Sequence, residues 1–379
     1  MEKRQKFFIE ILSCAFEKKS IKSVPENLDW DKLFYSASKH KVAHLFYDVL
    51  KRSEISLPED VEKKFLKAYK SAVKKAAVFD AEFEYICDAF SDSKILFTAL
   101  KGAVIKNFYP DSSMRTMSDL DILLDEKDRK KAKEILLNSG YEITLDDVTH
   151  EDVFIKPPLM NVELHYSPVP KDQPEYIYYK EKINQLLNPE NPLFYEDQYI
   201  FLIVHTAKHF RNGGIGVRAI ADIFFFNRYE FSDKNYIENE LKILSLYDFE
   251  KQMKRLAEMW FADGEENEDL KLIGNYILGS GAFGLNKQLT LSNENVKKGN
   301  KKLYIFSRIF PLKNKMVSAY PLLKKTPILL PVFWMVRIFN AVLFKKDKLK
   351  SDLKSVENID ENNLKNLKEI FKKSGLKGD

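Results

Sequence analysis

Two aspartates lie one residue apart at the start of what otherwise reads as a buried β-strand. The segment SDLDILL, residues 118–124, places Asp119 and Asp121 beside a run of branched apolar residues. Isoleucine suits a half-buried pleated surface, whereas aspartate is depleted from strands. Positions two apart on a strand point to the same face, so both carboxylates should aim at one spot. Because like charges raise each other's pKa, the pattern predicts a cation between them.

A third carboxylate occupies a similar position on a later predicted strand. Glu163 lies in NVELHYS, where the apolar alternation leads us to expect an inward-facing residue. Magnesium prefers oxygen ligands, and a pair of such ions activates an attacking hydroxyl while neutralising a triphosphate. We therefore expect Asp119, Asp121 and Glu163 to bind two Mg²⁺ ions, with Mn²⁺ as a substitute. His165, on the same strand face as Glu163, is either a base or substrate contact or a supporting residue.

The order of predicted elements indicates an α+β fold with a small mixed β-sheet core flanked by N-terminal and C-terminal helical regions. Residues 1–92 are predicted to be helical, and residues 93–170 alternate short strands with helices before ending in further strands. Residues 171–295 form a second helical domain. A basic, apolar-rich segment covers residues 296–346, and residues 347–379 form a polar, mobile tail with a weak terminal helix.

The composition describes a globular protein that is long enough for two or three domains. Of 379 residues, 45% are hydrophobic and 31% are charged. Cys14 and Cys87 are far apart and lack metal-binding spacing, so a disulfide framework is not expected and a cytoplasmic setting is favoured. Residues 1–16 begin with charges followed by an apolar stretch, as a signal peptide does, but Glu10 and the helical spacing of the apolar residues favour an amphipathic first helix.

Positive charge is concentrated near the C-terminus. Residues 296–346 contain twelve Lys or Arg and no Asp or Glu, so the rest of a chain of net charge +5 carries −7. This segment is either a solvated cationic face over the core, a peripheral contact with the inner membrane surface, or a phosphate-binding surface for nucleic acid. The first is favoured, and no nucleic-acid module is recognisable. Its most apolar stretch, residues 326–344, is broken by prolines and polar residues, which favours a packed or membrane-surface helix over a spanning one.

The segment LKGAVIKNFYPDSSMRTMSDLDILL resembles the nucleotidyltransferase superfamily, in which a glycine-containing strand-to-helix turn is followed by D-x-D. More narrowly, the LKG turn, the YP…R…SD-D segment and the later ELH strand resemble a bacterial family of uncharacterised nucleotidyltransferases. The resemblance implies an ATP-binding or other NTP-binding transferase that moves a nucleoside monophosphate to an acceptor and releases pyrophosphate. It also implies that Asp119, Asp121 and Glu163 are the catalytic, metal-binding carboxylates.

The same resemblance suggests which residues contact the substrate, and it includes a departure. The superfamily has Gly-Ser or Gly-Gly at the turn, whereas this chain has Lys101-Gly102-Ala103, so Lys101 would replace a serine hydroxyl as a point charge for a phosphate. Gly102 would let the backbone approach the phosphates because it lacks a Cβ. The full set of expected nucleotide or substrate contacts is Lys101, Gly102, Arg115, Ser118, His165, His209, Arg218 and Asp222.

Structural alternatives remain open for several of these residues. Arg115 and Ser118 could simply order the loop before the strand, and Arg218 with Asp222 could form a helical i, i+4 ion pair. His205 and His209 share a helix face, but Thr206 stands where a zinc motif needs glutamate.

The sequence leaves the acceptor, the base preference and the oligomeric state open. Rival functions are a non-catalytic nucleotide-binding or membrane-surface protein on the same fold, and a phosphotransferase whose product would be a nucleoside diphosphate. We further expect Asp119→Asn or Asp121→Asn to abolish turnover without loss of stability, because either change relieves carboxylate repulsion.

Overall fold

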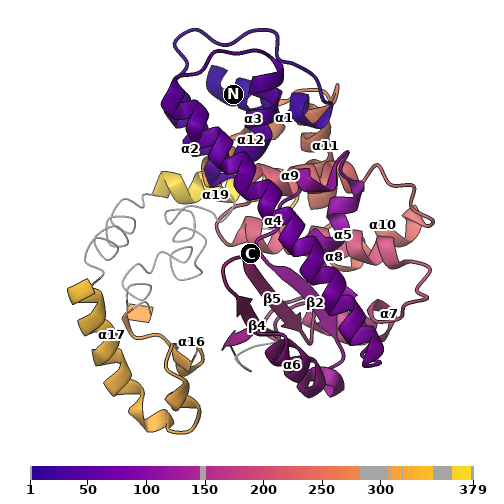
Figure 1. The fold of residues 1–379 in the computed structure, drawn as a ribbon, viewed down its shortest axis with the longest axis vertical. Helices are drawn as coiled ribbons and strands as arrows, with labels where there is room; N and C mark the ends of the chain where they lie inside the picture. The colour runs from indigo at the N-terminus through magenta and orange to yellow at the C-terminus, as the bar shows by residue number, and fades with distance from the viewer. Residues whose placement is uncertain are drawn as a thin grey trace.

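The computed structural model describes residues 2–145, 151–281, 306–344 except 308 and 318, and 361–376. These residues form a mostly helical protein around one five-stranded mixed sheet (Figure 1), which confirms the predicted α+β class. Cys14 and Cys87 are free thiols.

Four helices precede the sheet: α1 (Lys3–Phe16), α2 (Trp30–Lys39), α3 (Ala43–Arg52) and α4 (Glu59–Asp92). Helix α1 buries one apolar face that includes Phe7 and Phe8, as expected for an amphipathic helix. Helix α4 follows Pro58, has three acidic residues in its first turn and runs for 34 residues along the molecule (Figure 1).

The sheet has the order β1-β2-β5-β4-β3. Its strands are β1 (Phe97–Ala99), β2 (Leu120–Leu124), β3 (Glu142–Leu145), β4 (Glu151–Lys156) and β5 (Met160–His165). Strands β2 and β5 are parallel, and the other neighbours are antiparallel. Between β1 and β3 lie α5 (Gly102–Ile105), the short 3-10 turns η1 (Lys106–Phe108), η2 (Ser112–Met114) and η3 (Glu126–Asp128), and helix α6 (Arg129–Asn138).

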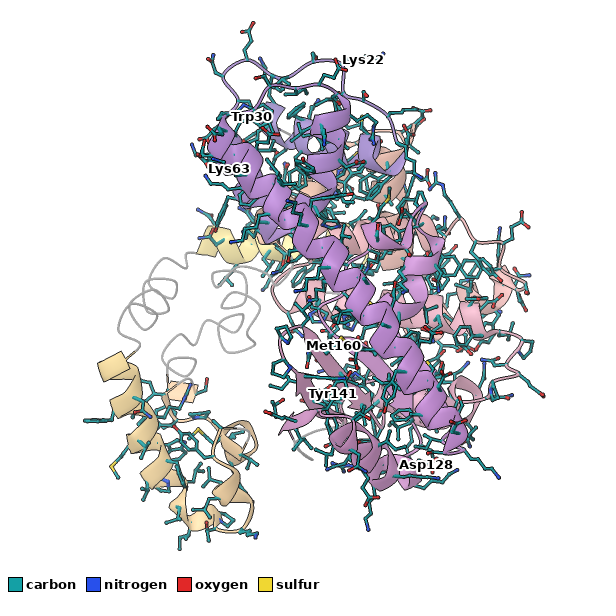
Figure 2. All side chains as sticks on the ribbon, in the orientation of Figure 1. Lys22, Trp30, Lys63, Asp128, Tyr141 and Met160 are labelled. Atoms are coloured by element: carbon teal, nitrogen blue, oxygen red, sulfur yellow. The ribbon has the colours of Figure 1, made fainter. Side chains whose placement is uncertain are left out.

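One face of the sheet packs against α4 and α6. Phe79, Ile86 and Phe90 of α4 join Leu120, Ile122 and Leu124 of β2 in a core that also contains Leu136 of α6. Tyr141 and Met160, labelled in Figure 2, are buried in or near the same layer. The opposite face is approached by helix α8, since Leu123 of β2 shares a core with Ile203 of α8. Gln198 of α8 also donates to the carbonyl of Ala99 in β1 at 3.0 Å.

Between the sheet and residue 281 the chain forms α7 (Tyr176–Leu186), α8 (Phe194–Arg211), α9 (Val217–Phe226), α10 (Lys234–Ile243), α11 (Tyr247–Phe261) and α12 (Glu268–Ser280). They share one hydrophobic core with α1, α2 and α3. The ring of Phe16 in α1, for example, contacts those of Phe225 in α9 and Phe261 in α11 at 4.9 and 5.2 Å. The helical regions that precede and follow the sheet therefore stabilise each other.

Residues 306–344 form a separate small unit, which we call the basic unit. It contains α16 (Lys313–Val317), η4 (Pro321–Lys324), η5 (Pro327–Leu329) and α17 (Leu330–Phe344), with Met316, Val317 and Leu323 at its centre. Over the residues that the structure describes, no helix combines the length and the apolar character needed to cross a membrane.

The predicted terminal helix is present as α19 (Glu361–Lys373), and it is anchored to the helical core instead of projecting as a mobile tail. Leu367 and Phe371, four residues apart, are buried, and Lys373 forms an ion pair with Asp269 of α12 at 3.0 Å. The segment is polar overall, and this composition led to the prediction of a mobile tail although a narrow apolar face is present. Residues 347–360 of the predicted tail lie outside the described part of the chain.

Candidate active site

The register of the two parallel strands brings the predicted carboxylates together. Asp121 of β2 lies directly beside Glu163 of β5, and Leu123 lies beside His165. Because registered residues on neighbouring strands point to the same face, Asp121, Glu163 and His165 share the face that α8 approaches. Asp119 lies immediately before β2, two residues from Asp121.

The side chains of Asp121, Glu163 and His165 form a compact cluster. Nε2 of His165 lies 2.9 Å from Oδ1 of Asp121 and 3.5 Å from Oε2 of Glu163. One potential ligand atom from each residue lies within 4.8 Å of the other two. Asp121 is buried, whereas 21% of the Glu163 side chain is exposed, so the cluster reaches solvent through Glu163. The carboxylates of Asp121 and Glu163 supply the oxygen donors that suit Mg²⁺ or Mn²⁺.

Lys101 contributes a cation from the turn after β1. Its Nζ donates to Oδ1 of Asp121 at 2.5 Å, although the two residues are 20 positions apart. Lys101 adopts a positive φ of 52°, so the turn places its conformational strain on the lysine and not on Gly102. A Cβ on Gly102 would approach Cγ of Met117 to 2.9 Å, which gives the glycine a packing role at this turn.

The pKa values of the two aspartates are shifted in opposite directions. Burial alone would raise the pKa of Asp121, but the Lys101 ammonium and the His165 hydrogen bond outweigh burial and hold that pKa well below its usual range. Burial raises the pKa of Asp119, and the charges of Asp121 and Glu163 raise it further. The sequence predicted that the two carboxylates raise each other's pKa unless a cation lies beside them, and for Asp121 the Lys101 ammonium is that cation.

Arg115 and Asp222 contact each other. Nε and Nη2 of Arg115 donate to the two carboxylate oxygens of Asp222 at 2.7 and 2.9 Å, and the hydroxyl of Tyr109 donates to Oδ1 at 2.6 Å. All three side chains are buried. This network fixes the segment before β2 to helix α9, which is the loop-ordering alternative for Arg115.

Arg218 lies near the same segment, and its hydrogen-bond acceptor is a backbone carbonyl. Its Nη1 donates to the carbonyl of Thr116 at 3.0 Å. Burial and the Arg115 charge lower the pKa of Arg218 to about 10, with the Asp222 and Asp119 carboxylates opposing this shift. Arg218 is therefore a cation held close to Asp119. Ser118, next to Asp119, is partly exposed.

Helix α8 places further basic groups beside the cluster. Burial lowers the pKa of His205 well below its usual range, with a further contribution from the Lys101 charge and an opposing one from Asp121. The rings of His205 and His209 lie edge to face at 4.4 Å, and His209 is exposed. Burial also lowers the pKa of Lys208, and Lys101 adds to this effect.

Sequence reasoning missed Glu151 and Lys75. Glu151 pairs with His165 across β4 and β5, and its Oε2 lies 3.4 Å from Nδ1 of His165. Period-two alternation at the start of this strand places Glu151 and Asp152 on opposite faces, but it does not say which of the two faces the cluster. Lys75 of α4 lies 5.1 Å from the ring centroid of Phe79, and burial lowers its pKa while Asp119 raises it. Nothing in the pattern of α4 distinguishes Lys75 from the other lysines of that helix.

Comparison with known proteins identifies the family. Residues 26–262, more than half of the chain, match a family described as uncharacterised nucleotidyltransferase. No curated protein and no solved structure matches. The matched range contains the sheet, the carboxylate cluster and the helices that approach it. The chain therefore belongs to the uncharacterised nucleotidyltransferase family.

Proposed function

We propose that this protein transfers a nucleoside monophosphate from an NTP to the hydroxyl or phosphate of an acceptor, with release of pyrophosphate. The observation that carries the proposal is the cluster of Asp121, Glu163 and His165 on one face of β2 and β5, with Asp119 at its edge. Family membership supports the reaction class.

Asp119, Asp121 and Glu163 are the residues that would hold two Mg²⁺ or Mn²⁺ ions. The clustering of three carboxylates fits this assignment, because their mutual repulsion raises the pKa of Asp119 in addition to the effect of its burial. When bound, such ions lower the pKa of an attacking hydroxyl and neutralise charge on a triphosphate.

Neighbouring side chains fix the orientation and the ionisation state of the cluster. His165 and Lys101 both contact Oδ1 of Asp121, which keeps Asp121 ionised and fixes its orientation. Glu151 contacts the other ring nitrogen of His165 and so restrains the imidazole from the side opposite Asp121. The partly exposed Glu163 is the group through which a substrate would reach the cluster.

Basic side chains from three helices support an anionic substrate. Lys75 of α4 and Arg218 of α9 interact electrostatically with Asp119, and Lys208 of α8 interacts with Lys101. A triphosphate carries several negative charges, and cations converging from separate helices raise its local concentration and position it. The acceptor and the preferred base are open.

The test is isothermal titration of each of the four NTPs in the presence of Mg²⁺. We expect wild type to bind at least one NTP in a metal-dependent manner and Asp119→Asn/Asp121→Asn to lose this binding. Asp125→Asn is the matched control, because Asp125 lies just beyond β2 and accepts from Lys127 on the surface. Absence of binding by the wild type to all four NTPs would contradict the proposal.

Product analysis separates the reaction classes. Pyrophosphate supports nucleotidyl transfer, whereas a nucleoside diphosphate assigns phosphotransfer and contradicts the proposal. In either assay, Asp119→Asn should lower turnover by at least about 1,000-fold, the effect of losing a group that neutralises transition-state charge. Metal-dependent binding without cleavage, over a broad set of acceptors, would favour a non-catalytic nucleotide-binding role.

A further inference from the structure

Helix α17 of the basic unit exposes a continuous apolar stripe. Met335 and Phe339 are 63% and 64% exposed, and Val332, Val336 and the preceding Ile328 extend the stripe. Positions 332, 335, 336 and 339 have the i, i+3, i+4, i+7 spacing of one helix face. Contiguous exposed apolar surface of this kind marks an interaction site in a folded protein.

Packing of the opposite face fixes which side of α17 is exposed. The ring of Phe333 lies 4.7 Å from that of Tyr320, and Nε1 of Trp334 donates to the carbonyl of Pro311 at 2.9 Å. These contacts hold the inner side of α17 against the rest of the basic unit. Figure 2 shows side chains extending from the outer side of α17, away from the rest of this unit.

The charge around the stripe has one sign. The sequence from 296 to 346 contains twelve Lys or Arg and no acidic residue. Lys325 is exposed just before α17, and Lys345 and Lys346 follow directly after it in the sequence. The partner of this surface must therefore offer an apolar layer and negative charge at the same place.

We propose that the basic unit docks on an anionic lipid bilayer, with α17 lying in the plane of the interface. The stripe of Met335 and Phe339 would enter the boundary between headgroups and acyl chains, and the lysines would face the anionic headgroups. This site is separate from the nucleotidyl-transfer chemistry and does not depend on it.

Two other occupants fit the surface less well. A nucleic acid would neutralise the lysines but leave the apolar stripe without a partner. A second copy of the chain could cover the stripe, but it would bring a like-charged segment against this one, which is unfavourable. Of these three, the anionic bilayer complements both the apolar stripe and the positive charge.

The experiment is flotation of the full chain with vesicles. We expect the protein to float with vesicles of phosphatidylcholine containing about one third phosphatidylglycerol, the fraction that gives a strongly anionic surface, and to stay behind with phosphatidylcholine alone. Met335→Asp/Phe339→Asp should weaken the partition at least about tenfold, because two apolar side chains no longer enter the boundary. Lys325→Gln should weaken it about fivefold, and added salt should weaken it for every variant.

Ile243→Asp is the matched control, since Ile243 is 69% exposed on α10 and receives the same change of character outside the basic unit. It should float like the wild type. Equal recovery with neutral and anionic vesicles, no recovery with either, or an equal loss in Ile243→Asp would overturn the proposal. A dimer in light scattering that Met335→Asp/Phe339→Asp abolishes would overturn it in favour of a second copy. Vesicle-independent binding of RNA that Lys325→Gln weakens would likewise assign the surface to nucleic acid.

Discussion

On one face of β4 and β5, Asp152 is enclosed by cations from α6; on the other face, Asp121, Glu163 and Glu151 gather around His165 and Lys101. Asp152 is fully buried, and both of its oxygens accept from Arg129, at 2.9 and 2.7 Å. Tyr166 also donates to it, and Lys133 lies at 3.7 Å. Adjacent residues, Glu151 with Asp152 and His165 with Tyr166, thus serve opposite faces of the sheet.

The difference shows how a buried carboxylate can be assigned to structure or to function. The charges of Arg129 and Lys133 neutralise the Asp152 carboxylate, so this face of the sheet has no unbalanced negative charge at Asp152. On the α8 face, the carboxylates of Asp119, Asp121, Glu151 and Glu163 lie close to one another, and the pKa values of Asp119 and Glu151 are raised by burial and by neighbouring carboxylates. Carboxylates that cluster near solvent and raise one another's pKa are the arrangement that accommodates metal ions.

The largest effect on stability is expected from replacing Asp152, on the face of the sheet that packs against α6. Asp152→Asn leaves the Arg129 guanidinium partly buried without its countercharge, which should lower the free energy of unfolding by about 3 kcal/mol. Turnover per folded molecule should stay close to the wild-type value, since Asp152 points away from the cluster. Urea denaturation measures the first quantity, and an active-site-normalised rate measures the second. A large loss of turnover in folded Asp152→Asn would erase the distinction between the two faces.

Smaller effects on stability, opposite in sign for Asp121 and Asp119, are expected within the cluster. Asp121→Asn removes the close partner of Lys101 and should cost about 2 kcal/mol, a reduced value because Asp119 and Glu163 still offset the lysine charge. Asp119→Asn should leave stability unchanged or raise it by up to about 1 kcal/mol, because it relieves repulsion. The sequence predicted the second outcome for both residues, and the ion pair with Lys101 reverses it for Asp121. Equal melting temperatures for the two variants would show that Lys101 does not pair selectively with Asp121.

The smallest effect is a pH dependence from Asp119, measured in the presence of a chelator. A raised pKa in the folded protein means that the folded state binds the proton more tightly than the unfolded chain does. The stability from Asp119 is therefore present below about pH 4, the usual aspartate value, and is lost as the pH rises through the raised pKa. The gain in unfolding free energy of Asp119→Asn over wild type should thus grow with pH, by up to about 1 kcal/mol. A gain that stays constant with pH would refute this origin.

The sequence was sufficient to predict the sheet and the convergence of Asp121 with Glu163. Both residues interrupt apolar alternation on strands, and that local pattern survives in the structure. Contacts between distant segments could not be predicted in the same way. Arg115 and Asp222 are 107 positions apart, and no local period links them. The adjacent acids Glu151 and Asp152 were also ambiguous, because alternation places them on opposite faces without saying which face is which.

Because α19 packs on the helical core, the distance between the basic unit and that core is limited. In the sequence the basic unit lies between α12 and α19. Both of these helices belong to the core, so the chain connects the unit to the core on both sides. Residues 345–360 join it to α19, and a stretch of that length cannot extend beyond about 60 Å. A bilayer that holds α17 would keep the core in a layer above the lipid whose depth this connection limits. Any acceptor in that layer would then be searched for in nearly two dimensions, at a high effective concentration.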